Sequence, residues 1–140
     1  MAVSPTSKAL KWLRESGLHP GVVEHWNAFA RKRVDLWGFI DIIAIRDGDP
    51  IRYIQVTSWT NVNARIQKIL TTQGDKKDPD RKKAFEILGK HRCAHVEVWG
   101  FQSGRVPKDH VNLKVVRLDI DRDGKTNKTI SKWNSRAAKL

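Results

Sequence analysis

The spacing of hydrophobic residues predicts three helices in this chain. Ser4 and Pro5 suit the cap and the first position of a helix, and apolar residues at helical spacing follow until Gly17. Asn61 can cap a second helix. The apolar stripe of this second helix consists of Val62, Ile66, Ile69 and Leu70. A third, short helix is predicted over 84–88.

The remaining apolar segments predict strands. Residues 36–45 are apolar at odd and even positions apart from Gly38 and Asp41, which is typical of a strand covered on both faces of a sheet. The turn sequence at 47–50 joins this strand to a second one at 51–57, giving a β-hairpin. Shorter alternating runs predict strands at 22–26, 95–101 and 113–120. The order of these elements indicates an α/β fold, a mixed β-sheet flanked by helices.

The length of the chain and its cysteine content describe one domain without disulfides. The chain has 140 residues, and we assign 1–120 to the domain and 121–140 to a basic C-terminal arm or a helix laid on its surface. The single cysteine, Cys93, cannot form an internal disulfide, which favours a reducing compartment. Neither a signal segment nor a membrane-length apolar stretch occurs in the sequence. We therefore expect a cytoplasmic protein with no membrane partner.

Positive charge dominates the composition but is unevenly distributed. Lys and Arg number 27 against 15 Asp and Glu, a formal net charge of +12, which favours a polyanionic partner such as nucleic acid. Residues 35–58, by contrast, contain four acidic and two basic side chains. A basic exterior around an acidic, strand-borne centre suits a metal-dependent phosphodiesterase, in which carboxylates hold Mg²⁺ while the periphery attracts phosphate.

The predicted hairpin brings oxygen ligands together. Asp41 on its first strand is a direct or near neighbour of Gln55 on its second, at a Cβ separation of about 5 Å. Two such side chains can share one hard cation. Thr57 lies two residues beyond Gln55 and so points to the same face.

In these residues the sequence resembles the PD-(D/E)XK nuclease superfamily, with closest likeness to archaeal-type Holliday junction resolvases and small phage nucleases. The likeness covers roughly 5–101. Asp41 matches the metal-binding aspartate of the family, Gln55 its glutamate position and Thr57 its lysine position. The resemblance implies the restriction-endonuclease-like core fold, Mg²⁺ or Mn²⁺ as cofactor, a homodimer, and the host cytoplasm as location if the chain is phage-encoded.

Two positions depart from the family pattern. Gln55 offers a carbonyl oxygen but no charge, and Thr57 cannot supply the positive charge of the lysine. Arg65 or Lys68, on the following helix, could take over that charge. The family often adds a carboxylate from its first helix.

Three acidic residues could supply this additional carboxylate. Glu15 lies next to the end of the first helix, Glu24 lies on the short strand after it, and Asp35 lies six residues before Asp41. Among them we favour Glu24. Asp35 shares a strand face with Asp41, and so could join the metal ligands, if no bulge occurs at Gly38.

Basic and aromatic residues near these elements predict contacts with DNA. The polar stretch 74–83 looks like an exposed loop. We expect DNA contacts from Lys76, Lys77, Arg81, Lys82 and Lys83. Trp59, directly after the strand that carries Gln55, could stack on a base or sugar.

The sequence therefore predicts an Mg²⁺-dependent endodeoxyribonuclease that hydrolyses phosphodiester bonds, with branched DNA such as a Holliday junction as the substrate we favour. Two alternatives stay open. The departures at Gln55 and Thr57 are also compatible with a non-catalytic DNA-binding protein on a degenerate nuclease scaffold. An RNA-binding protein is the third interpretation, although no aromatic signature of a known RNA module is recognisable.

Overall fold

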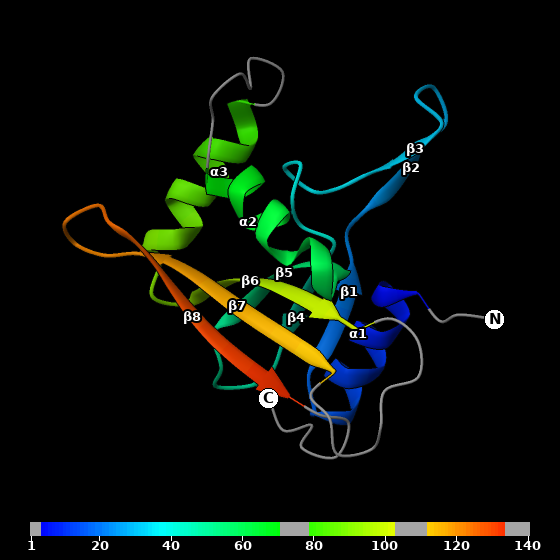
Figure 1. Ribbon diagram of the computed structural model, residues 1–140, viewed down its shortest axis with the longest axis horizontal. Coiled ribbons are helices and arrows are strands. Elements are labelled where there is room, and N and C mark those ends of the chain that lie inside the picture. Colours follow the sequence, from blue (N-terminus) through cyan, green and yellow to red (C-terminus); the bar gives the residue numbers. More distant parts are fainter. Residues whose placement is uncertain (1–3, 71–78, 103–111, 134–140) are drawn as a thin grey trace.

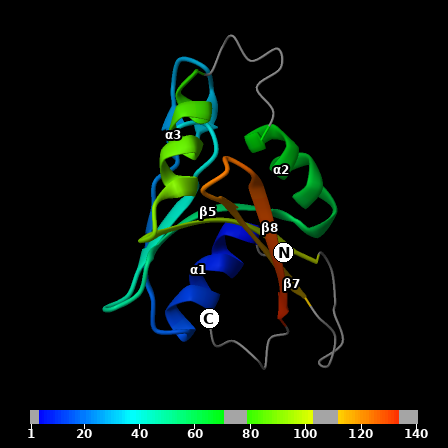
Figure 2. The same ribbon diagram turned by 90° about the vertical axis from the view of Figure 1, so that its left-hand side faces the viewer.

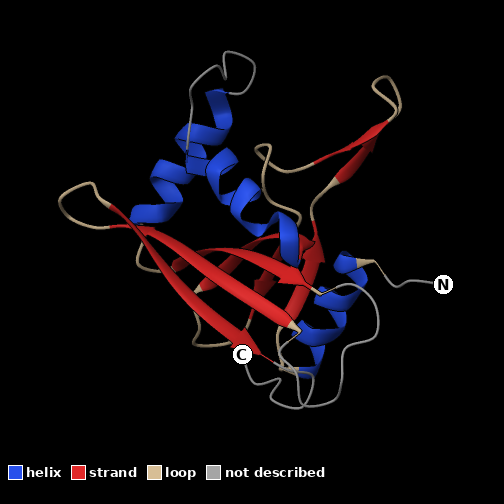
Figure 3. Ribbon diagram, viewed as in Figure 1, coloured by secondary structure: helices blue, strands red, loops and turns tan. Residues whose placement is uncertain are grey.

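A six-stranded mixed sheet with helices on both faces organises the chain (Figures 1 and 3). The computed structural model describes residues 4–70, 79–102 and 112–133. The elements are α1 (Pro5–Glu15), β1 (His19–Val22), β2 (His25–Asn27), β3 (Lys32–Val34), β4 (Ile42–Ile45), β5 (Ile51–Ser58), the 3₁₀ turn η1 (Trp59–Asn61), α2 (Val62–Leu70), α3 (Pro79–Lys90), β6 (Ala94–Phe101), β7 (Leu113–Ile120) and β8 (Thr126–Trp133). The predicted α/β class is confirmed.

The strand order in the main sheet is β1-β4-β5-β6-β7-β8. All neighbours are antiparallel except β5 and β6, which are parallel and are joined through η1, α2 and α3. A parallel pair requires such a crossover connection. The strands β2 and β3 form a separate two-stranded sheet, which Figure 1 shows extending away from the main one.

Two hydrophobic cores lie on opposite faces of the sheet. Helix α1 covers one face, with Ala9, Trp12 and Leu13 buried against the sheet. Helices α2 and α3 cover the other face, and Figure 2 shows them across the sheet from α1. Side chains alternate between faces along a strand, so Ile54 and Val56 of β5 pack beneath α1. Gln55 and Thr57 therefore point to the side of α2 and α3.

The predicted start of α1 and the predicted β-hairpin are both confirmed. The Ser4 hydroxyl accepts a hydrogen bond from the backbone N–H of Ser7, and Pro5 occupies the first turn of the helix. In the hairpin, Ile42 of β4 pairs with Ile54 of β5. The turn between these strands contains Gly48 at φ +79°, a value that glycine adopts without strain.

The predicted strand over 36–45 is wrong in its first half. Only Ile42–Ile45 is a strand, because the chain reverses at Trp37 and Gly38, both of which have positive φ. The apolar pattern that suggested a long strand arises because Phe39 and Ile40 are buried within this turn, against the core beneath α2 and α3. A run of apolar residues at both odd and even positions indicates that the segment is buried. A buried turn produces this pattern as well as a strand does.

The predicted strand at 22–26 is divided between two sheets. Residues His19–Val22 form β1 and His25–Asn27 form β2. Pro20 lies within β1, which is an edge strand of the main sheet. A proline is tolerated there since its missing N–H costs no ladder hydrogen bond.

The predicted loop and short helix over 74–88 are corrected by α3, which already begins at Pro79. Proline is favoured in the first turn of a helix, and α3 packs against β6 and β7. Residues 74–78 of the predicted loop lie outside the described part of the chain.

The predicted C-terminal arm or surface helix is also corrected. Residues Thr126–Trp133 form β8 and pair with β7 along their whole length. Polar side chains dominate both faces of this edge strand, so no apolar alternation marked it in the sequence. Residues 134–140 lie outside the described part of the chain.

Candidate functional site

Three carboxylates meet at the start of β4, near the β1 edge of the sheet. Glu24, Asp35 and Asp41 each place one carboxylate oxygen within 4.8 Å of the others. We call these residues the acidic cluster. They come from three different segments: Glu24 follows β1, Asp35 follows β3, and Asp41 precedes β4.

The sheet fixes Asp41 on both sides. The backbone N–H of Val23 donates to the carbonyl of Asp41, and the N–H of Asp41 donates to the carbonyl of Ile54, both at 2.9 Å. The carboxylate Oδ2 accepts from the N–H of Val56 at 2.8 Å. Asp41 is only 4% exposed, so these hydrogen bonds, rather than contacts with water, hold it in place.

A tight turn carries Asp35 back to Asp41. Leu36 and Ile40 form an isolated bridge, and the N–H of Gly38 donates to the carbonyl of Asp35 at 3.0 Å. The expectation that Asp35 and Asp41 lie on one face of a straight strand is therefore wrong. The two side chains meet because the chain reverses between them.

Gln55 links two members of the acidic cluster. Its Nε2 donates to Oδ2 of Asp35 at 3.3 Å and to Oδ2 of Asp41 at 3.2 Å. Gln55 is 3% exposed, and its Oε1 is buried without a hydrogen-bond partner among the described residues. The expected proximity of Asp41 and Gln55 is confirmed.

The environment of Asp41 opposes its ionisation. Burial of the carboxyl, its hydrogen bond with Asp35 and the neighbouring charges of Asp35 and Glu24 raise the pKa of Asp41 to about 8, although the hydrogen bond from Val56 acts in the opposite direction. A cation that binds between these carboxylates would offset their mutual repulsion and favour the ionised form of Asp41.

The donor set fits a hard divalent cation. Carboxylate and amide oxygens are the ligands that Mg²⁺, Mn²⁺ and Ca²⁺ prefer. Rotation of the Gln55 amide by 180° would turn its unpaired Oε1 toward Asp35 and Asp41 and add a fourth oxygen. Glu24, Asp35, Asp41 and Gln55 are thus the residues that could hold a metal.

In the described part of the chain, the other expected catalytic side chains place no positive charge in contact with this group. Thr57 is buried at 6% exposure on the same face as Gln55, but its hydroxyl carries no charge. On α2, Arg65 is half-buried and Lys68 is exposed, and neither forms an ion pair with the acidic cluster within the described ranges. Glu15 is exposed and lies 4.0 Å from Lys11.

The expected DNA contacts divide into three groups. Lys76 and Lys77 lie outside the described residues. Lys82 and Lys83 are exposed on α3, whereas Arg81 is only 6% exposed. The expectation of an exposed loop at Arg81 is therefore wrong: the residue is buried within α3, and this burial lowers its pKa. Its contact with DNA stays a prediction.

Trp59 is the aromatic residue that the sequence suggested for stacking. It lies in η1, directly after β5, and the ammonium of Lys114 sits 5.6 Å from its ring centroid. One face of this indole is thus engaged within the protein.

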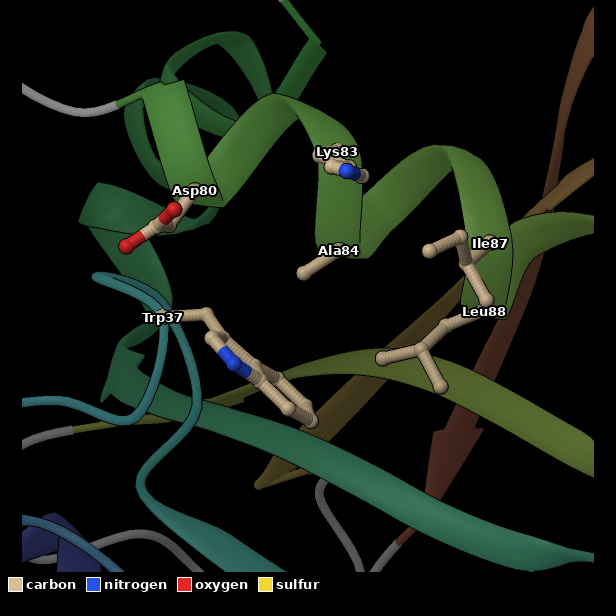
Figure 4. A pocket seen from close by; sticks show the side chains of 6 residues that line it. All are labelled: Trp37, Asp80, Lys83, Ala84, Ile87 and Leu88. Atoms are coloured by element: carbon tan, nitrogen blue, oxygen red, sulfur yellow. The ribbon is translucent and has the colours of Figure 1, made fainter.

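Trp37 is a residue near the site that the sequence did not single out. Its ring lies 6.5 Å from that of Tyr53, and it lines a pocket together with residues of α3 (Figure 4). The Trp37-Gly38 pair inside an apolar run was the available signal, since glycine there indicates a turn.

Comparison of the chain with protein-family models, curated proteins and solved structures finds no significant match. Within the residues that the structure describes, no helix is long and apolar enough to cross a membrane.

Proposed function

We propose that this chain is a metal-dependent DNA endonuclease with a PD-(D/E)XK-type core, acting on branched DNA as a homodimer. The observation that carries the proposal is the Gln55 amide, which bridges Asp35 and Asp41 beside Glu24 and has a buried oxygen without a partner among the described residues. The net charge of +12 supports a polyanionic substrate.

Each residue of the site has a role in this proposal. Asp41, Asp35 and Glu24 would hold Mg²⁺ or Mn²⁺, and Gln55 would add an amide oxygen once its side chain is rotated. When bound, the cation supplies Lewis-acid stabilisation of the charge that develops on a phosphodiester. The carboxylates also orient the attacking water by hydrogen bonding, and Arg65 is the half-buried cation that could approach the phosphate.

Cleavage assays test this function directly. Labelled four-way junction, nicked duplex and linear duplex are incubated with Mg²⁺, with Mn²⁺ or with EDTA. We expect metal-dependent cleavage, strongest on the junction, and a loss of about 100-fold or more in Asp41→Asn.

Asp47→Asn is the matched control, because it makes the same chemical change at an exposed position in the β4–β5 turn. Undiminished cleavage by the Asp41→Asn variant would overturn the proposal. Loss of activity in both variants would show that the effect is not specific to the acidic cluster. Light scattering during size-exclusion chromatography tests the homodimer.

A non-catalytic DNA-binding protein on the same scaffold is the second candidate. It is favoured by Thr57, which has no charge where the nuclease family has lysine, and by the absence of an ion pair between the acidic cluster and Arg65 or Lys68 in the described chain. Salt-sensitive binding without cleavage in any divalent metal supports it. Appearance of cleavage in the double variant Gln55→Glu, Thr57→Lys would show that only those groups were lost.

A further inference from the structure

A pocket of about 290 Å³ lies between the turn that follows Asp35 and helix α3. Trp37 forms one wall, and the other lining residues all come from α3: Asp80, Lys83, Ala84, Ile87 and Leu88. Figure 4 shows the flat face of the indole lying along the pocket, below Ala84 and beside Leu88. We call this the Trp37 pocket. Its walls are apolar, and its two charged residues belong to the first half of α3.

The Trp37 pocket is connected to the acidic cluster through neighbouring residues. Trp37 is two residues from Asp35 in the same turn, and its ring packs on Tyr53 at 6.5 Å between centroids. Tyr53 and Gln55 are two residues apart on one face of β5, so they are separated by about 7 Å along the strand. Trp37 and Tyr53 thus each lie two residues from a residue that could hold a metal.

Trp37 has a backbone conformation that is unusual for a large side chain. Its φ is +52°, in the left-handed region that bulky residues avoid, at a cost of roughly 1–3 kcal/mol. The side chain is nevertheless 40% exposed, and Ile87 on the opposite wall is 58% exposed. A glycine would satisfy the turn more easily, so the large exposed ring calls for an explanation beyond folding.

The dimensions and chemistry of the Trp37 pocket match a single aromatic base. Its volume is just below the range of about 300–1,000 Å³ for ligand pockets, so it has room for one ring system at most. Base stacking on an aromatic side chain tolerates any sequence, since every base has a π-face. At the edge of the base, Lys83 offers a hydrogen-bond donor and Asp80 an acceptor. The exposed Lys82 and Lys83 also attract the phosphate backbone of the DNA.

We infer that the Trp37 pocket binds one unpaired nucleobase of the DNA strand whose phosphodiester lies at the acidic cluster. This inference rests on the proposed nuclease function. Bases inside a duplex are paired and stacked and cannot enter such a pocket, whereas a base at a junction centre, flap or single-stranded segment can. The Trp37 pocket thus selects DNA with an unpaired base next to the cleaved bond.

Binding measured without cleavage tests the inference separately from the nuclease activity. Fluorescence anisotropy in EDTA compares a duplex that carries one unpaired base with the same duplex carrying an abasic site at that position. We expect the wild-type protein to prefer the unpaired base by about 5- to 150-fold, the range that corresponds to base–aromatic stacking.

Three variants isolate the contribution of the ring. Trp37→Gly should abolish the preference while keeping the turn, because glycine adopts positive φ readily. Trp37→Phe should retain much of the preference through its aromatic face. Trp26→Ala is the matched control: Trp26 is a 60% exposed tryptophan on β2, and its removal should leave the preference unchanged.

The outcomes separate this inference from the proposed function. A preference that persists in Trp37→Gly overturns the inference even if the protein cleaves DNA. If the preference depends on Trp37 but the protein has no nuclease activity, base binding in the Trp37 pocket is supported and the proposed endonuclease function is excluded. If Trp37→Gly instead dissociates a dimer and leaves the base preference intact, the pocket is an interface between two copies of the chain, and the inference is wrong.

Discussion

At the scale of single residues, the buried carboxyl of Asp41 makes folding sensitive to pH. Its pKa is about 8 in the folded state against 3.8 for an unperturbed aspartate. Between these values the unfolded chain has lost the proton and the folded protein keeps it, so the folded state binds more protons. The free energy of unfolding in EDTA should therefore decrease as the pH rises from about 4 to 8, and then become level.

Urea denaturation across this pH range measures the effect. In the Asp41→Asn variant, which cannot ionise at this position, the decrease should be weaker than in the wild-type protein. Asp47→Asn, at an exposed site, should follow the wild-type curve. Parallel curves for the wild-type and Asp41→Asn proteins would contradict the assignment of the pH dependence to Asp41.

Gln55 gives a second residue-scale prediction, on metal binding. Gln55→Glu adds a carboxylate to the acidic cluster and removes the Nε2 donor from Asp35 and Asp41. Without metal the variant should lose about 1–3 kcal/mol of stability, because buried acceptors are left unsatisfied. With saturating Mg²⁺ the loss should be reduced or reversed, since an added carboxylate strengthens binding of a hard cation.

Thermal unfolding in EDTA and in Mg²⁺ checks this prediction. Asn63→Asp, an equal charge change on the exposed face of α2, should show no metal-dependent shift in Tm. A Gln55→Glu variant that is as stable as wild type in EDTA and indifferent to Mg²⁺ would argue against a metal at the acidic cluster.

At the scale of elements, two ion pairs of the buried Glu97 connect β5, β6 and β7. Glu97 of β6 is fully buried and accepts hydrogen bonds from Arg52, Arg117 and the indole N–H of Trp99. Arg52 itself has only 11% of its side chain exposed. Removal of the carboxylate would leave this guanidinium buried without its partner.

Glu97→Ala should accordingly lower the free energy of unfolding by about 3–5 kcal/mol. Chemical denaturation measures the change. Glu15→Ala is the control, since the exposed pair of Glu15 with Lys11 is worth at most about 0.5 kcal/mol. Equal effects of the two variants would show that the Glu97 network contributes no more than a surface pair.

The contact between η1–α2 and β6 depends on a glycine. A Cβ at Gly100 would lie 2.2 Å from Cγ2 of Val62 and 3.1 Å from the Cα of Trp59. Gly100→Ala should therefore displace η1 and the start of α2 and destabilise the protein by about 1–3 kcal/mol. Gly21→Ala, where the nearest atom is the carbonyl oxygen of Ile43 at 3.9 Å, is the matched control in denaturation experiments. Similar stabilities of the two variants would contradict close packing at Gly100.

At the scale of the whole molecule, the net charge of +12 predicts binding that depends strongly on salt. If about 6–10 phosphates are contacted, affinity for duplex DNA should fall by about 10³–10⁵ between roughly 50 and 200 mM salt. Anisotropy titrations over this range give the slope of log K against log salt. Binding that is independent of salt would exclude the phosphate backbone as the main partner.

The exposed lysines of α3 should account for part of this slope. Replacing Lys82 and Lys83 together by alanine should reduce it by roughly two, because each phosphate that a lysine neutralises adds about 0.9 to the slope. Lys11→Ala, which removes a solvent-exposed ammonium on α1, should leave the slope nearly unchanged if α1 faces away from the DNA. An undiminished slope in the α3 double variant would exclude these lysines from the interface.

The sequence by itself determined the features that depend on local periodicity and local chemistry. The cap of α1, the β4–β5 turn and the apolar stripe of α2 follow from neighbouring residues alone. A two-residue side-chain period and a short turn also placed Asp41 beside Gln55, because they fix the register of a hairpin. The basic composition indicated a polyanionic partner without any knowledge of the fold.

Only the tertiary structure decided what meets across long distances in the chain. The chain reversal at Trp37 and Gly38 brings Asp35 to Asp41 and forms one wall of the Trp37 pocket. The sequence did not reveal it, because the apolar residues of this segment are buried in a turn and not in a strand. The pairing of β8 with β7 was hidden because an edge strand with polar faces has no hydrophobic period. Periodicity reports that a residue is buried, whereas its partner is set by the packing of the whole sheet.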